Sequence, residues 1–289
     1  MSHELPRKTR ELHNHHFDST IWNDFEFRND DIIIATYAKS GTTWLQQIIA
    51  QLLFEAADDL EVAEMSPWMD LRVPPKEVKL EEVAKQTHRR FVKTHLPVDA
   101  LVFAEQAKYI YIGRDGRDVV WSMYNHHANA NEAWYEALND TPGRVGPPIE
   151  KPPASIKQYF NEWLDNDGHP WWAIRHLPNV LFIRFSDLKR DMPGEIRRVA
   201  AFLETPIDED KWESILLHCS FDYMKANATK SVPLGGGVLG RRSTTFIHKG
   251  KNDRWRDTLD QDQVQRYERR CLEELGPECA RWLATGGPF

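Results

Sequence analysis

The chain has 289 residues and a formal net charge of −7, from 37 Lys and Arg against 44 Asp and Glu. This length allows one or two domains. With 41% hydrophobic and 28% charged residues, the composition is that of a folded globule and not of a disordered, collagen-like or coiled-coil chain. No apolar run approaches the roughly 20 residues that span a bilayer, and residues 1–16 lack the apolar stretch of a signal peptide. We therefore expect a cytoplasmic protein without a membrane partner.

Net acidity argues against nucleic acid as a partner, because that affinity comes mainly from cations that neutralise phosphates. A small anionic ligand needs only a local positive site and stays possible. The three cysteines are Cys219, Cys271 and Cys279, with no CxxC pair, which favours reduced thiols over disulfides or zinc. His13, His15 and His16 lack acidic or cysteine partners at ligand spacing. We interpret them as part of a flexible, solvated tail over residues 1–20, and we expect no metal site.

Apolar runs and helical spacings alternate along the chain. Four short apolar runs predict buried strands at residues 31–36, 90–94, 109–113 and 179–185. Helical spacing of apolar residues predicts helices at residues 44–54, 116–127, 156–165, 193–203, 209–217 and 261–275. This alternation predicts a single α/β domain over residues 1–289, with a central, mostly parallel sheet flanked by helices. Ligands of such folds bind at the carboxyl ends of the strands.

Two stretches break the alternation and predict loops. Residues 139–153 contain five prolines, and a surface loop this long is usually functional or disordered. Residues 232–256 begin with a glycine-rich segment and end with six Lys or Arg against Asp253 as the one acid. A ligand-binding loop and a solvated basic loop explain this second stretch equally well.

The loop after the first predicted strand has the features of an anion site. It carries Lys39 and Gly41, and a helix follows at Thr42 and Thr43. The first N–H groups of a helix lack internal partners and attract negative charge, and glycine lets a phosphate approach the backbone closely. The P-loop pattern places its lysine directly after the second glycine, whereas here Lys39 stands two residues before Gly41. The alternative is a structural role without a ligand, in which Lys39 is solvated and the threonines cap the helix.

The segment YAKSGTTW at residues 37–44 resembles the phosphosulfate-binding signature of cytosolic sulfotransferases, usually YPKSGTTW, with Ala38 in place of proline. That family transfers sulfonate from 3′-phosphoadenosine 5′-phosphosulfate (PAPS) to a hydroxyl or amine, releases adenosine 3′,5′-bisphosphate, and needs no metal. Its fold is a P-loop-like α/β domain related to nucleotide kinases. The resemblance implies that PAPS is held by Lys39, Ser40, Gly41, Thr42, Thr43 and Trp44.

The segment KTHLP at residues 93–97 ends the second predicted strand. A histidine at a strand end is often structural. At the carboxyl end of a parallel strand it faces the ligand crevice, and an imidazole can accept a proton near neutral pH. KTHLP also resembles the family's catalytic-base motif. The resemblance implies that His95 is the catalytic base and that Lys93, with Lys39, acts on the phosphosulfate.

Later segments of the sequence match the family's motifs less closely. Arg114 and Ser122 fit the family's 3′-phosphate spacing, while Arg117 stands where lysine is frequent; balancing of nearby acids is the alternative for these arginines. FIHKGKNDRW at residues 246–255 resembles the block that closes on that phosphate, with His248 replacing arginine. The resemblance also implies nucleotide contacts from Phe185, Cys219, Phe221, Met224, His248, Lys249 and Gly250. For Phe185 and Phe221, plain core packing is equally plausible.

The function that the resemblance implies is in-line sulfonate transfer from PAPS to a hydroxyl of a small phenolic or alcoholic acceptor. An apolar acceptor pocket is expected among the tryptophans Trp22, Trp68, Trp134, Trp171 and Trp172. His126 and His127 lie near it or form an ordinary helix end. Either a monomer or a homodimer fits, since the family's C-terminal dimer motif has no good match. Two alternatives stay open, namely a P-loop kinase or NTPase that holds magnesium through Asp115 and Thr43, and a non-catalytic adenosine-bisphosphate binder.

Overall fold

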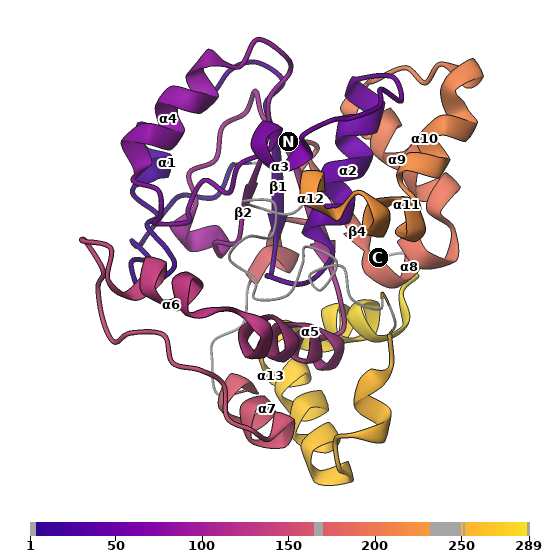
Figure 1. Cartoon of the computed structure of the whole chain (residues 1–289). Coiled ribbons are helices and arrows are strands. Elements are labelled where there is room, and N and C mark those ends of the chain that lie inside the picture. Colours follow the sequence, from indigo (N-terminus) through magenta and orange to yellow (C-terminus); the bar gives the residue numbers. More distant parts are fainter. Residues whose placement is uncertain (1–3, 165–169, 232–249, 251, 288–289) are drawn as a thin grey trace.

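A sheet of four parallel strands forms the centre of the molecule (Figure 1). The computed structural model describes residues 4–164, 170–231, 250 and 252–287. The strands lie in the order β2-β1-β3-β4, with bounds β1 Ile32–Thr36, β2 Phe91–Thr94, β3 Lys108–Gly113 and β4 Val180–Arg184. All four predicted strands are confirmed. Nearly every strand residue is buried, which is why their sequences read as continuous apolar runs.

Helices surround this sheet on both faces. They are α1 Ile21–Asp24, α2 Thr42–Leu53, α3 Val62–Met65, α4 Lys76–Lys85, α5 Gly116–Asn129, α6 Glu132–Asn139, α7 Ile156–Leu164, α8 Phe185–Arg190, α9 Met192–Leu203, α10 Trp212–His218, α11 Phe221–Ala226, α12 Ala228–Ser231 and α13 Gln261–Thr285. Short 3₁₀ turns lie at Val98–Ala100, Pro170–Ile174, Glu209–Lys211 and Arg254–Asp257. The six predicted helices all form, and the expected single α/β domain is confirmed.

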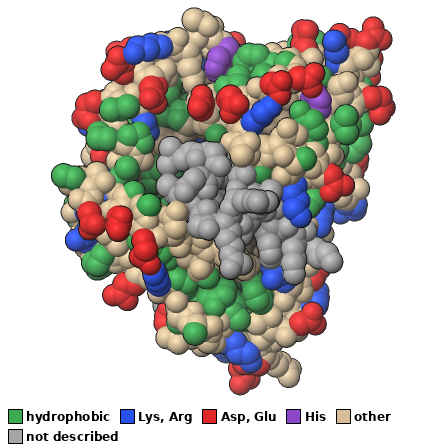
Figure 2. Space-filling model, viewed as in Figure 1, with side chains coloured by type: hydrophobic (Ala, Val, Ile, Leu, Met, Phe, Trp, Pro, Cys, Tyr) green, Lys and Arg blue, Asp and Glu red, His purple; other side chains and the backbone are tan. Residues whose placement is uncertain are grey.

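Alternate strand residues build two hydrophobic layers. Ile34 and Ile110 face a cluster that includes α2 and α9, and Figure 1 shows these helices together with α10 on one side of the sheet. Ile33 and Tyr109 face the other cluster, which includes Trp171 and, from α13, Trp282. Among the described residues, no helix has both the length and the apolar character needed to cross a bilayer. On the face in Figure 2, acidic and basic side chains are interspersed.

Three boundaries differ from the sequence prediction. Phe185, predicted to end a strand, begins α8. The helix predicted at residues 261–275 continues to Thr285 after a break at Gly276, whose φ of 76° only glycine adopts readily. Of the predicted loop at residues 232–256, residues 232–249 and 251 lie outside the described residues, and the end forms a 3₁₀ turn. The other predicted loop is confirmed, because residues 140–155 contain no helix or strand.

Residues 4–20, expected to be a flexible tail, pack against the rest of the domain. The N–H groups of Thr9 and Arg10 donate to the carbonyl of Asp99 at 2.8 and 3.1 Å. Ser19 is fully buried, and its hydroxyl accepts a hydrogen bond from the Leu12 N–H at 2.8 Å. Apolar side chains of this segment join the second hydrophobic layer. The charged sequence concealed these contacts, because they are made mostly by the backbone.

Candidate active site at the carboxyl edge of the sheet

Three of the predicted motifs meet at one edge of the sheet. The loop with Lys39 leaves β1, His95 follows β2, and Arg114 follows β3. β1 pairs with both β2 and β3, so the carboxyl ends of all three strands are neighbours. The strand order therefore brings together residues that are 75 positions apart, as in the hydrogen bond of 3.2 Å from Arg114 Nη1 to the carbonyl of Lys39.

His95 is buried and held by three groups. Its Nδ1 lies 2.9 Å from the carbonyl oxygen and 3.0 Å from the hydroxyl of Thr36, and its backbone N–H donates to the Asp70 carboxylate at 3.1 Å. A carbonyl can only accept, so Nδ1 carries the hydrogen and Nε2 carries the lone pair of the neutral ring. This tautomer is the one in which Nε2 can take a proton from a substrate.

Asp70 is a residue that the sequence prediction missed. It is fully buried, and its carboxylate accepts hydrogen bonds from the indole N–H of Trp68 at 2.8 Å and of Trp22 at 3.3 Å, besides the backbone of His95. Its segment pairs with the edge of β2, since Met69 N–H donates to the Lys93 carbonyl at 3.0 Å. Asp70 thus fixes the peptide that carries His95.

The site concentrates positive charge in a desolvated place. Burial and the nearby charges of Lys93 and Arg114 lower the pKa of Lys39 to about 7. Burial lowers the pKa of Lys93 to about 8, against the opposing effect of Asp70. Ammonium groups with such lowered pKa values favour an anion beside them, because the anion restores their charged form. Both lysines that were predicted to act on the phosphosulfate therefore lie at an edge of the sheet where a bound anion would be favourable.

The start of α2 forms a backbone cradle beside Lys39. Gly41 caps this helix with a φ of 120°, and a Cβ there would lie 2.7 Å from the Phe185 ring. Within the described part of the chain, the N–H groups of Gly41, Thr42 and Thr43 donate to no protein acceptor. The Thr42 hydroxyl contacts the Thr36 hydroxyl at 2.7 Å, and Ser40 is buried. The cradle therefore offers mainly backbone donors to an anion.

Arg114 extends this site toward α8. Its guanidinium lies 4.3 Å from the centre of the Phe185 ring, and its Nη2 is 3.3 Å from Oδ1 of Asn252. Asn252 in turn donates to the hydroxyl of Ser186 at 2.9 Å. Asn252 was not predicted as a site residue, although it lies within the segment FIHKGKNDRW. The arrangement places one cation and one aromatic face next to the α2 cradle.

Trp44 and Phe221 border the same region. The indole N–H of Trp44 donates to the carbonyl of Cys219 at 2.8 Å, and its ring lies 5.6 Å from that of Phe185 in an edge-to-face contact. Gly250 packs on Phe221, because a Cβ there would lie 2.8 Å from the ring. Six of the predicted nucleotide contacts thus adjoin one another: Lys39, Gly41, Trp44, Arg114, Phe185 and, by its backbone, Cys219.

For five predicted residues, the structure shows no side-chain contact with this group or the residue lies outside the described residues. The side chains of Cys219 and Met224 are buried, and that of Cys219 lies in the core under α2, so Cys219 can offer a ligand its backbone alone. Ser122 lies on α5 and is partly exposed. His248 and Lys249 lie outside the described residues.

Arg117, which stands where the family often has lysine, has a structural role. It pairs with Asp115 at 2.7 Å and with Glu268 at 3.0 Å. Its guanidinium lies 3.8 Å from the centre of the Trp255 ring. These contacts bind the start of α5 to α13 and leave Arg114 as the arginine of this motif that adjoins Lys39.

Aromatic rings and histidines form a wall beside His95. Trp68 lies 4.7 Å from the His95 ring and 6.2 Å from the ring of His16. Trp134 of α6 follows, at 5.4 Å from His16 and 5.5 Å from His126. We call Trp68, His16, Trp134, His126 and His127 the aromatic wall. His127 joins it through a ring distance of 5.6 Å to Trp134 and a 2.8 Å hydrogen bond with Tyr159.

The aromatic wall corrects the expectation for His16. His16 is part of it and not of a solvated tail, and burial lowers its pKa well below the usual value. Burial and Lys39 lower the pKa of His126 well below its usual value and that of His127 to about 4, so these rings are neutral near pH 7. Among the described residues, no group of His, Cys, Asp or Glu could hold a metal ion.

The tryptophans expected to form one pocket are divided. Trp68 and Trp134 lie in the aromatic wall, whereas Trp22 and Trp171 are almost completely buried in the core. Trp172 lines a different cavity, beside α13. Two of the five tryptophans therefore lie in the aromatic wall, and the expectation that all five form one pocket is wrong. Sequence position near irregular segments could not separate core rings from wall rings.

Comparison with known proteins agrees with this geometry. The model of the sulfotransferase domain matches residues 29–277. A glycolipid sulfotransferase of Mycobacterium tuberculosis is 28% identical over 300 residues, which cover 93% of this chain and 92% of that protein. Sulfotransferase 1 family member D1 of Rattus norvegicus is 31% identical over 260 residues, which cover 87% and 85% of the two chains.

Solved structures share the fold. The mouse sulfotransferase SULT7A1 complexed with PAP matches with a TM-score of 0.71 and 23% identity over 92% of both chains. Retinol dehydratase in complex with androsterone and the inactive cofactor PAP matches with a TM-score of 0.65 and 25% identity, over 89% of this chain and 83% of that one. The chain therefore belongs to the sulfotransferase family and is a PAPS-dependent sulfotransferase.

Proposed function

We propose that this enzyme transfers the sulfonate group of PAPS to a hydroxyl of a small phenolic or alcoholic acceptor by in-line displacement, with His95 as general base. The observation that carries the proposal is the hydrogen bond of 2.9 Å from His95 Nδ1 to the Thr36 carbonyl. It leaves Nε2 as the basic nitrogen at the same sheet edge as Lys39 and Lys93.

The proposed reaction moves one proton from the acceptor to His95 and one sulfonate group from PAPS to the acceptor. His95 Nε2 takes the proton of the acceptor hydroxyl while that oxygen forms a bond to sulfur. The bond from sulfur to the 5′-phosphate oxygen breaks, and adenosine 3′,5′-bisphosphate leaves with the bonding pair. Lys39, Lys93 and the first N–H groups of α2 stabilise the charge that develops on the leaving oxygen. Arg114 holds the 3′-phosphate by paired hydrogen bonds.

The aromatic wall supports an acceptor with an apolar body. Trp68 presents its ring 4.7 Å from His95, and Trp134 continues that surface. Flat faces of this kind favour an aromatic or alicyclic acceptor. The neutral rings of His126 and His127 add hydrogen-bonding groups without a net charge.

We also propose that PAPS is contacted by the remaining predicted residues Ser40, Thr43, Ser122, Phe221, Met224, His248, Lys249 and Gly250, and that the enzyme is cytoplasmic.

A transfer assay tests this function. With ³⁵S-labelled PAPS and a panel of phenols, sterols and sugar alcohols, we expect label in at least one acceptor and no loss of rate in EDTA. A kinase or NTPase would need magnesium, and its expected ligand Asp115 instead caps α5 and pairs with Arg117. Nucleotide binding with no labelled product from any acceptor would contradict the proposal and favour a non-catalytic binder.

The lowered lysine pKa values predict a pH dependence of nucleotide binding. Lys39 has a pKa of about 7 without ligand, and a bound phosphate raises it. Above pH 7 the protein must therefore take up a proton on binding, so affinity falls as pH rises, by up to about tenfold per pH unit between pH 7 and 9. Lys93, with a pKa of about 8, adds to the fall above pH 8.

Titration calorimetry with adenosine 3′,5′-bisphosphate measures this effect. In buffers of different ionisation enthalpy, proton uptake near pH 8 is the expected signal. The matched variant is Lys39→Arg, because arginine stays charged over this range; its affinity should vary less with pH. An affinity of the wild type that does not change from pH 7 to 9 would contradict the lowered pKa of Lys39.

A further inference from the structure

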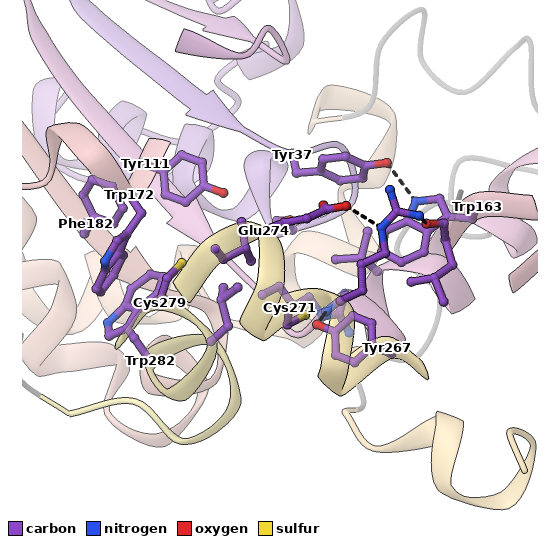
Figure 3. A pocket seen from close by; sticks show the side chains of 18 residues that line it. Tyr37, Tyr111, Trp163, Trp172, Phe182, Tyr267, Cys271, Glu274, Cys279 and Trp282 are labelled. Atoms are coloured by element: carbon purple, nitrogen blue, oxygen red, sulfur yellow. Dashed lines mark hydrogen bonds and ion pairs between the residues drawn. The ribbon is translucent and has the colours of Figure 1, made fainter. Parts of the chain in front are cut away.

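A cavity of about 120 Å³ lies between α13 and the sheet, apart from the aromatic wall (Figure 3). Tyr111 of β3 and Phe182 of β4 line one end, together with Trp172, Cys279 and Trp282. The other end holds Tyr37, Trp163, Arg270 and Glu274. The cavity and the aromatic wall have no lining residue in common, and His95 does not line it.

The Tyr111 hydroxyl is directed into this cavity. Figure 3 shows it pointing from the aromatic end toward the middle. Tyr111 is 9% exposed, and its ring stacks on Trp171 at 5.5 Å. Figure 3 marks no hydrogen bond from its Oη to another of the residues that line the cavity. Burial raises the pKa of this phenol, so it stays neutral. A hydroxyl that faces a cavity can form a hydrogen bond with a ligand bound there.

The two ends of the cavity differ in polarity. At the aromatic end, the rings of Trp172, Phe182 and Trp282 form most of the surface, and the Tyr111 hydroxyl lies among them with the two indole nitrogens and the Cys279 sulfur. At the other end, the indole N–H of Trp163 donates to the Tyr37 hydroxyl at 2.8 Å, and Arg270 pairs with Glu274 at 2.5 Å. Ring faces of the kind found at the aromatic end favour a flat aromatic occupant.

The volume limits the size of the occupant. An apolar cavity of about 150 Å³ accommodates benzene, so 120 Å³ suits one ring and not a steroid or a nucleotide. We propose that this cavity is a second small-molecule site, which binds a single-ring phenol with its hydroxyl on Tyr111. The site shares no lining residue with the aromatic wall, and it borders the proposed donor site at Ser40 and Arg114.

Fluorine NMR with 4-fluorophenol tests the proposal on the full chain, with saturating adenosine 3′,5′-bisphosphate and no turnover. Cys279→Phe fills the cavity with a ring and should remove one equivalent of bound 4-fluorophenol. The matched control is Leu272→Phe, which places the same ring on an exposed position of α13 and should change nothing. Any 4-fluorophenol at the aromatic wall stays bound in both variants, so the number of equivalents separates the two sites.

A second variant keeps the proposal testable if Cys279→Phe fails to fold. Tyr111→Phe preserves the ring and removes one hydrogen bond, so the affinity of this equivalent should fall about threefold to tenfold. Unchanged binding in Tyr111→Phe, or no lost equivalent in a folded Cys279→Phe, would overturn the proposal. The proposed function is tested separately, because His95 and the transfer assay play no part in this experiment.

Discussion

Replacing His95 with alanine is expected to lower kcat by about 10²–10⁴-fold, the usual contribution of a general base. The variant loses an imidazole whose Nδ1 is held by the Thr36 carbonyl at 2.9 Å, which leaves Nε2 as its basic nitrogen. The affinity for adenosine 3′,5′-bisphosphate should stay within about twofold, because the nucleotide is proposed to contact other residues. Single-turnover assays with labelled PAPS measure the first quantity and calorimetry the second.

Two controls separate a lost base from a disturbed site. His176→Ala removes an exposed histidine and should leave the rate unchanged. His95→Gln keeps a hydrogen-bonding side chain of similar reach, so it tests whether packing beside Trp68 is enough; its rate should stay as low as that of His95→Ala. Retention of most activity in either His95 variant would refute the base assignment.

The strand ends explain why much of the site could be predicted. Lys39 and His95 each follow an apolar run directly, and in a parallel sheet such positions share one edge. The roles of these residues were predicted from the resemblance of their motifs, and a parallel sheet is enough to place the motifs at one edge. The strand order, which makes them neighbours, was not predicted. The same argument covers Arg114, which follows β3, and the observed contact between Arg114 and the Lys39 carbonyl agrees with it.

Residues supplied by packing between distant segments could not be predicted. Asp70 reaches His95 because its segment pairs with the edge of β2, and no periodic pattern announces that pairing. His16 lies in a charged stretch whose composition indicates a solvated tail, yet it packs between Trp68 and Trp134. Local propensity is silent on contacts of this kind, because they depend on tertiary structure.

Several helices, among them α4, were also not predicted from the sequence. α4 has a charged sequence with few apolar residues, and its Lys79 is buried with its ammonium on the carbonyl of Met69 at 2.5 Å. From the sequence alone, a lysine such as Lys79 is expected at the surface, so its role as a buried hydrogen-bond donor could not be predicted. Phe185 belongs to the same class of error, because the apolar run of β4 continues without a break into α8.

Replacing Lys39 with methionine is expected to lower kcat by about 10²–10³-fold, the typical cost of removing one group that stabilises developing charge. The same variant should be more stable than the wild type at pH 7. Lys39 binds its proton less tightly when folded, with a pKa of about 7, than when unfolded, near 10.5, so this lysine destabilises the fold below its unfolded pKa. Methionine meets the same backbone strain at a φ of 68° without that charge.

The two measurements together distinguish a catalytic lysine from a structural one. A structural lysine would lose stability and activity together, whereas Lys39→Met should lose activity and gain a higher Tm. The matched control is Lys85→Met, which removes an exposed lysine paired with Glu81 and should alter neither quantity appreciably, since exposed ion pairs contribute little. A lower Tm of Lys39→Met, or a kcat close to that of the wild type, would contradict the role of Lys39 in holding the leaving phosphate. The expected opposition follows from the site itself: the desolvated charges that make it bind an anion are unfavourable until the anion is present.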